Sequence, residues 1–182
     1  MVLWWFKIWR YLRGVENGNY RETFFKAFTG NKNNITILGK CTWINPNITV
    51  GKNVVIYPDT MFWGDGEIRI GDDVNIGNGT IIYASKTGGV EIGDNTVIAA
   101  QTYIIDCDHG FKEQTLIRKQ ANSVKKITIG NDVWLAANCT ILKGSKSGDG
   151  SIIGAKSLVK GEIPENVVAV GIPAKTIKGR YE

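Results

Sequence analysis

A large aliphatic residue recurs at every sixth position through most of this 182-residue chain. Small or turn-forming residues dominate the next three positions, and a small or β-branched residue occupies the fifth. A period of six fits neither the 3.6-residue repeat of an α-helix nor the two-residue alternation of a long strand. It predicts short strands separated by corners, in hexads that open at Val50, Ile56, Ile70, Ile76, Ile82, Ile92, Ile98, Ile104, Ile129, Leu135, Ile141, Ser147, Ile153 and Val159.

Three such strands close one triangular coil, and stacked coils form a solenoid with the repeated aliphatic side chains in columns inside. Gly and Asn at the corners tolerate the backbone conformations that sharp turns need. The pattern therefore predicts an all-β solenoid, although it does not fix the handedness. Ser147 stands where a column requires an aliphatic residue, so we expect a thinly filled place in the core there.

The hexad register is interrupted at three places. Two are short and rich in glycine, at residues 63–66 and 85–89, and they predict widened corners. The third spans residues 110–126 and carries five basic residues. A non-repetitive segment of that length inside a solenoid is typical of a functional loop. We therefore expect a loop over 110–126 that projects from the coils.

Residues 35–175 resemble the hexapeptide-repeat acyltransferases, which include galactoside, maltose and serine acetyltransferases and many O-acetyltransferases of surface polysaccharides. The sustained hexads carry this likeness, and residues 163–175 resemble the usual exit from the family's solenoid. The resemblance implies a left-handed parallel β-helix with a short helical N-terminal segment. It divides the chain into an aromatic and helical cap segment (1–34), the β-helix domain (35–175, with loop 110–126) and a tail (176–182).

His109 is the only histidine in the sequence and directly precedes the loop. Imidazole suits a general base, because its ordinary pKa of about 6.5 lies close to the working pH. His109 also resembles the family's catalytic histidine; a solvated loop residue is the alternative. The resemblance implies an acyltransferase that moves acetyl from acetyl-CoA to a saccharide hydroxyl in surface-glycan biosynthesis. The hydroxyl would attack the thioester directly, with the Ala137 amide as a candidate oxyanion donor.

Two acidic residues beside His109 are candidate substrate contacts. Asp106 and Asp108 could orient the imidazole or bind sugar hydroxyls, although acidic residues at corners more often cap turns. Counting from Ile104 places Asp108 at the inward fifth position. Cys107 between them could form an acyl-enzyme, but a nucleophilic cysteine needs a base positioned beside it.

Asn78 and Trp134 complete the candidate substrate contacts. Trp134 matches a tryptophan that the family places near its pocket, and packing against the loop is the alternative. Asn78 opens a series of third hexad positions that continues with Ala100, Ala137 and Ala155. If the coils stack as proposed, these small residues form an outward column. Cys139, at a small fifth position, is expected to pack in the core.

The alanines of that column are candidate coenzyme contacts. A strip of small side chains lets a linear ligand lie against the backbone and pair with its amides, which suits the pantetheine arm of CoA. The alternative is that the corners simply require small residues. Downstream basic residues would meet the CoA phosphates near the C-terminal end of the column, namely Lys156, Lys160, Lys175, Lys178 and Arg180.

The first 34 residues lie outside the repeats. Residues 1–13 are aromatic and basic, and they are too short and too charged for a bilayer span and lack the cleavage site of a signal peptide. The spacing of apolar residues in 19–29 predicts a short helix with Phe24, Phe25 and Phe28 on one side. We expect the segment to cap the first coil or contact another subunit; a peripheral membrane contact through residues 1–13 is the alternative.

Composition narrows the partners and the location. Three scattered cysteines fit neither a disulfide framework nor a paired metal spacing, so a reducing cytoplasm is expected, with contact to the inner face of the membrane as an option. The net charge is +5 and the pI about 9.1, yet no nucleic-acid-binding motif accompanies them. A phosphorylated ligand such as acetyl-CoA fits this charge better. The resemblance also implies a homotrimer with sites between subunits.

Three other functions remain open. An N-acyltransferase that acts on an amino sugar nucleotide uses the same fold. A metal-dependent enzyme of the carbonic anhydrase type requires three histidine ligands, which disfavours it here, and no metal cofactor is expected. A structural β-helix subunit without activity is the non-enzymatic alternative, in which His109 would have no catalytic role.

Overall fold

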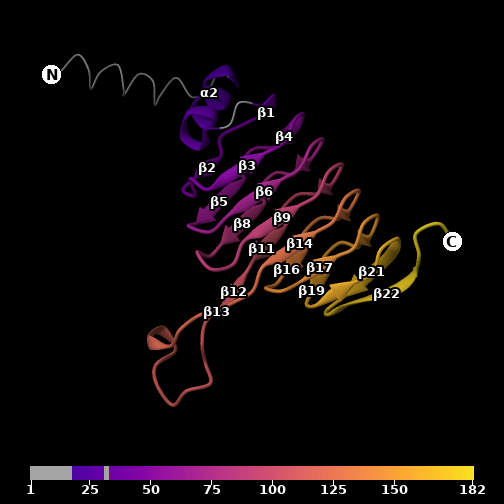
Figure 1. Ribbon diagram of the computed structural model, residues 1–182. Helices are drawn as coiled ribbons and strands as arrows, with labels where there is room; N and C mark the ends of the chain where they lie inside the picture. Colours follow the sequence, from indigo (N-terminus) through magenta and orange to yellow (C-terminus); the bar gives the residue numbers. More distant parts are fainter. Residues whose placement is uncertain (1–17, 31–32) are drawn as a thin grey trace.

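The computed structural model describes residues 18–30 and 33–182 (Figure 1). Residues 35–171 form a column of stacked triangular coils, and three parallel sheets make its sides. A helix, α2 (Gly18–Thr29), lies against the first coil. The loop predicted from the register break projects from the side of the column. The described residues thus show the solenoid that the repeats predict, with the left-handed parallel β-helix that the family resemblance implies.

Each sheet collects strands from successive coils. Sheet 1 contains, in order, β1 (Ile35–Ile37), β4 (Val54–Ile56), β7 (Asn75–Ile76), β10 (Val97–Ile98), β15 (Trp134–Leu135), β18 (Ile152–Ile153), β21 (Val167–Gly171) and the antiparallel β22 (Ala174–Gly179). Sheet 2 contains β2 (Thr42–Trp43), β5 (Met61–Gly64), β8 (Ile81–Ala84), β11 (Tyr103–Ile105), β16 (Thr140–Ile141) and β19 (Leu158–Val159). Sheet 3 contains β3 (Ile48–Val50), β6 (Ile68–Ile70), β9 (Val90–Ile92), β14 (Ile127–Ile129), β17 (Lys146–Ser147) and β20 (Glu162–Ile163).

Strand register shows how the interruptions are accommodated. In the regular C-terminal coils, Leu135 lies beside Ile153, which is 18 residues or three hexads later. Earlier coils are longer, since Ile76 lies beside Ile98. The coil that carries the loop is the longest, because Ile98 lies beside Leu135. The extra residues therefore project outward at the corners, and the pairing between strands of neighbouring coils stays in register.

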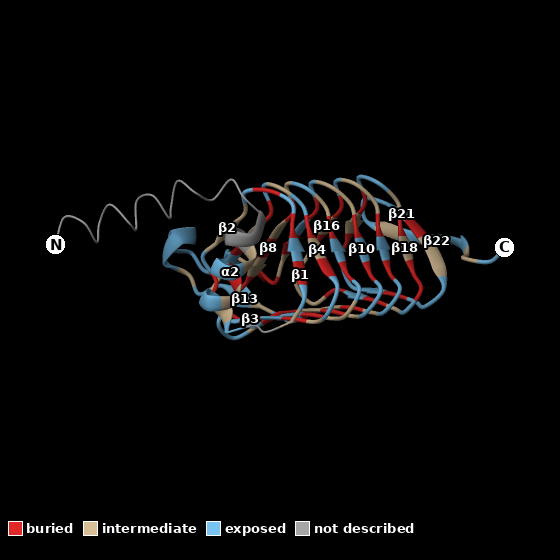
Figure 2. Cartoon of the chain, turned by 90° about the horizontal axis from the view of Figure 1, so that it is seen from above, coloured by how far each residue is buried: buried red, intermediate tan, exposed pale blue. Residues whose placement is uncertain are grey.

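The interior is made of the two inward positions of each hexad. Side chains at the hexad openings are buried, as are the fifth positions, which include Thr80, Thr96, Val133 and Cys139 (Figure 2). Burial raises the pKa of the Cys139 thiol, so this residue packs as a small neutral side chain. The corners carry left-handed backbone conformations, for example at Asn95 and Asn138. Both predicted roles, inward packing and turning, are confirmed.

Ser147 is buried in the column between Ile129 and Ile163, and its hydroxyl has no hydrogen-bond partner. We expect Ser147→Val to raise the free energy of unfolding by about 1 kcal/mol, because it fills space and removes an unsatisfied group. The melting temperature should rise by about 2–4 °C. Ser145→Val is the matched control and should be destabilising, because the Ser145 hydroxyl donates to the Val159 carbonyl (3.0 Å). An unchanged or lower melting temperature for Ser147→Val would mean that the position is already filled.

Helix α2 covers the open end of the first coil, and its Phe25 side chain makes the buried contact. Phe25 is fully buried and packs on Trp43 with 4.4 Å between ring centroids, and Trp43 stacks on Phe62 at 4.6 Å. The three predicted phenylalanines share one side of the helix, within about 100° of one another. Only Phe25 is buried there, because Phe24 and Phe28 stack on each other and are exposed. They lie about a quarter turn away from Phe25 on the helix.

The role predicted for residues 1–13 lies outside the described residues. Among residues 18–30 and 33–182, none of the helices has the length and apolar character needed to cross a bilayer.

Candidate active site

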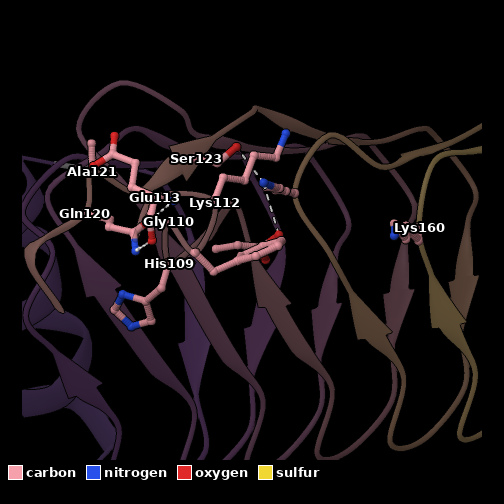
Figure 3. A pocket seen from close by; sticks show the side chains of 11 residues that line it. His109, Gly110, Lys112, Glu113, Gln120, Ala121, Ser123 and Lys160 are labelled. Atoms are coloured by element: carbon pink, nitrogen blue, oxygen red, sulfur yellow. Dashed lines mark hydrogen bonds and ion pairs between the residues drawn. The ribbon is translucent and has the colours of Figure 1, made fainter. Parts of the chain in front are cut away.

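His109 begins the projecting loop. It follows β12 (Cys107–Asp108), which pairs with β13 (Ser123–Val124) in an antiparallel two-stranded ribbon that we call the loop stem. The imidazole is exposed and extends away from Lys112 and Ser123 in Figure 3. Because the last stem pair joins Asp108 to Ser123, the position of His109 is set by the end of a hydrogen-bonded ribbon.

A cleft of about 520 Å³ lies between the loop and the β-helix, and His109 forms part of its wall. Its other lining residues come from the loop, the stem and two later corners: Asp108, Gly110, Phe111, Lys112, Glu113, Gln120, Ala121, Ser123, Lys143 and Lys160. The volume is sufficient for a sugar-sized ligand beside the imidazole. A histidine in such a cleft can take a proton from a bound hydroxyl.

The loop has a defined path of its own. The Gln120 side chain donates to the carbonyls of Glu113 and Thr115 at 3.0 Å each and accepts from the Glu113 amide at 3.1 Å. A single 3₁₀ turn, η1 (Ile117–Lys119), lies inside the segment that Gln120 closes. These contacts fold residues 113–120 into a compact unit at the edge of the cleft.

Asp106 does not face the cleft. Its side chain is fully buried and accepts hydrogen bonds from the Ser85 amide (2.9 Å), the Ser85 hydroxyl (2.7 Å) and the Gly89 amide (2.7 Å). Because both carboxylate oxygens are occupied in this corner, the prediction that Asp106 contacts substrate is wrong. Its role is to fix the widened corner at residues 85–89.

Asp108 turns outward rather than inward. Its carboxylate lies 3.0 Å from the Lys143 ammonium and its side chain is 44% exposed. The expected inward position fails because the hexad that opens at Ile104 ends early: Asp106 turns inward to complete the corner, which shifts the following residues out of phase. Cys107 is buried in the stem, which removes the access that an acyl-enzyme requires.

The predicted column of small residues is present at the corner between sheets 1 and 2. The carbonyls of Asn78, Ala100 and Ala137 each accept a hydrogen bond from the corner residue of the next coil. In the described part of the chain, the amide N–H groups of Ala100, Ala137 and Ala155 have no protein acceptor. The column therefore presents a strip of amide donors to a ligand.

Trp134 and Asn78 are exposed but do not line the cleft. Trp134 projects from the outer face of sheet 1, and its neighbours there are Val97 and Ile152. Packing of Trp134 against the loop is therefore excluded within one chain. Within one chain the structure brings neither residue to His109.

The five basic residues predicted to form one phosphate site are dispersed. Lys156 lies at the corner between sheets 1 and 2, whereas Lys160 reaches the cleft at the corner between sheets 2 and 3. Lys175 and Lys178 lie on β22, where Lys178 donates to the Glu182 carbonyl at 3.0 Å. Arg180 pairs with Asp132 at 2.6 Å, and this hydrogen bond raises the Arg180 pKa. The prediction that these residues form one phosphate site is therefore wrong, because positions that are close in sequence lie on different sides of the triangular coil.

Sequence reasoning did not single out Lys143, which lines the cleft. It lies 34 residues after His109 in the chain, in a corner where the hexads ordinarily need a small residue. A lysine in place of a small corner residue was the only available signal. In residues 18–30 and 33–182, no cluster of three or more His, Cys, Asp or Glu side chains could hold a metal ion.

The hexads, the coils and the loop define a hexapeptide-repeat protein. A family profile described as the hexapeptide repeat of succinyl-transferase matches residues 67–105. WcaF of Escherichia coli (strain K12), a proposed colanic acid biosynthesis acetyltransferase, is 32% identical over 133 residues, 73% of this chain and 70% of that protein. Galactoside O-acetyltransferase of the same organism is 36% identical over 131 residues, 71% of this chain and 63% of that protein. The chain therefore belongs to the hexapeptide-repeat acetyltransferases.

Solved structures agree with this assignment. A variant of AntD, an N-acyltransferase from Bacillus cereus in complex with dTDP and coenzyme A, superposes with a TM-score of 0.79 at 25% identity. This match covers 87% of this chain and 89% of that chain. A maltose O-acetyltransferase from Clostridium difficile 630 gives 0.65 at 26% identity, covering 92% and 78%. The chain spans 38%, 62% and 63% of three curated relatives that it matches.

Proposed function

We propose that this protein transfers an acetyl group from acetyl-CoA to a hydroxyl of a saccharide, in the synthesis of a surface glycan. The observation that carries this proposal is the position of His109, exposed at the wall of the cleft under the loop. The relatives named for galactoside and colanic acid acetylation support a saccharide acceptor. AntD and its coenzyme A support an acyl-CoA donor.

In this mechanism His109 accepts the proton of the acceptor hydroxyl as its oxygen attacks the thioester carbonyl. A backbone amide of the alanine column, with Ala137 as the candidate, donates to the developing oxyanion. CoA leaves as a thiol after it takes a proton from the imidazolium. The histidine thus begins and ends the cycle neutral.

One specific observation favours a second candidate, N-acylation of an amino sugar nucleotide. AntD is an N-acyltransferase, and its complex contains dTDP. The two candidates separate when hydroxyl sugars and amino sugars are offered with acetyl-CoA and the release of free CoA is followed. Turnover with hydroxyl sugars alone supports the proposal, and turnover restricted to amino sugars overturns it.

A complete site requires two copies of the chain. His109 lies at the corner between sheets 2 and 3, whereas the free amides of the alanine column lie at the corner between sheets 1 and 2. Two corners of one prism face different directions. Acetyl-CoA bound to the alanine column can therefore meet a His109 side chain only if another subunit supplies that histidine. This supports the homotrimer with sites between subunits, which light scattering would report as three times 20.0 kDa.

The outer faces of the sheets also support self-association. The outward row of sheet 3 is polar, with Arg69, Glu91, Lys146 and Glu162. The outward rows of the other two sheets are largely apolar and include Val97, Trp134, Ile152, Met61, Ile81, Tyr103 and Leu158. Such asymmetry is typical of a chain that buries two sides against copies of itself and leaves one in solvent.

Ala137→Leu tests the coenzyme strip. A larger side chain would hold a ligand away from the free amides, so we expect the KM for acetyl-CoA to rise about tenfold. The value of kcat should fall as well, because the Ala137 amide is the candidate oxyanion donor. Ala27→Leu, on the exposed side of α2, is the control for added apolar bulk and should leave both constants unchanged. A normal KM in Ala137→Leu would show that the coenzyme lies elsewhere.

A further inference from the structure

Lys143 connects the body of the β-helix to the stem of the loop. It lies in the corner that follows β16 (Thr140–Ile141), one coil beyond β11 (Tyr103–Ile105), from which the stem departs. Its ammonium group lies 3.0 Å from the Asp108 carboxylate and donates to the Ser123 hydroxyl at 2.6 Å. One side chain therefore contacts both strands of the ribbon.

These two partners face each other across the stem. Asp108 is paired with Ser123, and this is the last pair before the loop opens at His109. Backbone hydrogen bonds secure the other end of the stem, because the Lys125 amide donates to the Asp106 carbonyl and the Gly144 amide to the Lys125 carbonyl, both at 2.9 Å. At the end that carries His109, the link to the body is the ammonium group of Lys143.

The environment of Lys143 separates it from an ordinary surface ion pair. Its side chain is 24% exposed, whereas Lys146 in the next strand is 64% exposed and lies 3.5 Å from Glu162. Partial removal from water strengthens the attraction between opposite charges and lowers the freedom of the lysine chain. Lys143 also lines the cleft with His109, so a change in the contacts of Lys143 alters the shape of the cleft.

We propose that Lys143 is a positioning residue that places His109 in the cleft by clamping Asp108 and Ser123 at the end of the loop stem. This inference rests on the proposed function, in which His109 is the general base. A displacement of about 1 Å at a catalytic group lowers turnover by up to about 100-fold, so a clamp one residue away has a measurable effect.

The first test compares Lys143→Met with Lys146→Met, since both remove one positive charge and one ion pair from neighbouring positions. We expect Lys143→Met to lower kcat about tenfold or more, with the KM for acetyl-CoA within about twofold of the original. Lys146→Met should leave kcat unchanged. Lys143→Arg keeps the charge and can donate to both partners, so it should recover most of the activity. Normal kcat in Lys143→Met overturns the proposal.

The second test does not depend on turnover. His109 is the only histidine in the sequence, so one imidazole signal in the NMR spectrum reports the surroundings and the mobility of its side chain directly. In Lys143→Met the end of the stem that carries His109 is no longer held, so the His109 imidazole signal should change position and sharpen as the side chain becomes more mobile. Lys146→Met should leave the signal unchanged.

The His109 signal identifies which inference has failed. An inactive wild-type protein with every acceptor refutes the proposed function, and an unchanged His109 signal in Lys143→Met refutes the clamp whatever the activity. Lys143→Arg should return the signal toward its starting position. If Lys143→Met does not fold, Ser123→Ala keeps the charge and removes one contact; it should lower kcat about threefold, and an unchanged kcat overturns the clamp.

Discussion

His109→Ala is expected to lower the rate of acetyl transfer about 1,000-fold and to leave the binding of acetyl-CoA unchanged. The general base contributes about 10²–10⁴ in rate, and no other imidazole in the sequence can replace it. The proposed contact of acetyl-CoA is the alanine column, which lies on another corner. Steady-state kinetics with the best acceptor, together with calorimetric titration of CoA, measures the two effects separately.

Thr115→Ala is the matched control for this experiment. Thr115 lies in the same exposed loop and does not line the cleft, and only its carbonyl takes part in the loop's hydrogen bonds. Its activity should equal that of the unchanged protein. Full activity of His109→Ala would remove the general base from the mechanism and leave the β-helix without an assigned catalytic group.

Asp106→Ala is expected to destabilise the protein by about 3–5 kcal/mol, the largest effect on stability that we foresee. The substitution leaves the buried Gly89 amide and the partly buried Ser85 amide without an acceptor, and each such group costs about 1–3 kcal/mol. It also releases the Ser85 hydroxyl. Thermal and denaturant unfolding followed by circular dichroism would measure the loss.

Asp94→Ala provides the comparison for Asp106. The Asp94 carboxylate also accepts a backbone hydrogen bond, from the Asp72 amide at 2.7 Å, but it lies on an exposed corner where water can replace it. The loss there should be about 1 kcal/mol or less. If Asp106→Ala instead kept its stability and raised the KM for the acceptor, Asp106 would be a substrate contact after all.

The repeating parts of this fold could be read from the sequence because each hexad repeats the same physical requirement. An aliphatic side chain such as Ile76 or Ile141 at the opening, a small residue at the fifth position and a turn between them define one side of a triangle. The two glycine-rich breaks and the long loop also fell where the register failed. The column of Ala100, Ala137 and Ala155 followed from counting alone.

The parts that the sequence did not predict depend on contacts between distant positions. Asp106 takes its role from Ser85 and Gly89, which are close in space only after the coils stack. The contact of Lys143 with Asp108 and Ser123 has no periodic signature. The basic C-terminal residues were grouped because they are neighbours in sequence, whereas in a solenoid a few residues are enough to change the side of the prism.

The continuity of the ladder across the loop has a further consequence. Val97 remains beside Trp134 and Ile104 beside Ile141, although 17 residues of loop leave the coil between them. The length and composition of the loop can therefore change without a change in the β-helix from which it projects. Exchange of the loop between related β-helices should therefore change which acceptor binds and leave the alanine column unchanged. The acceptor side and the proposed coenzyme side of the site can thus evolve separately.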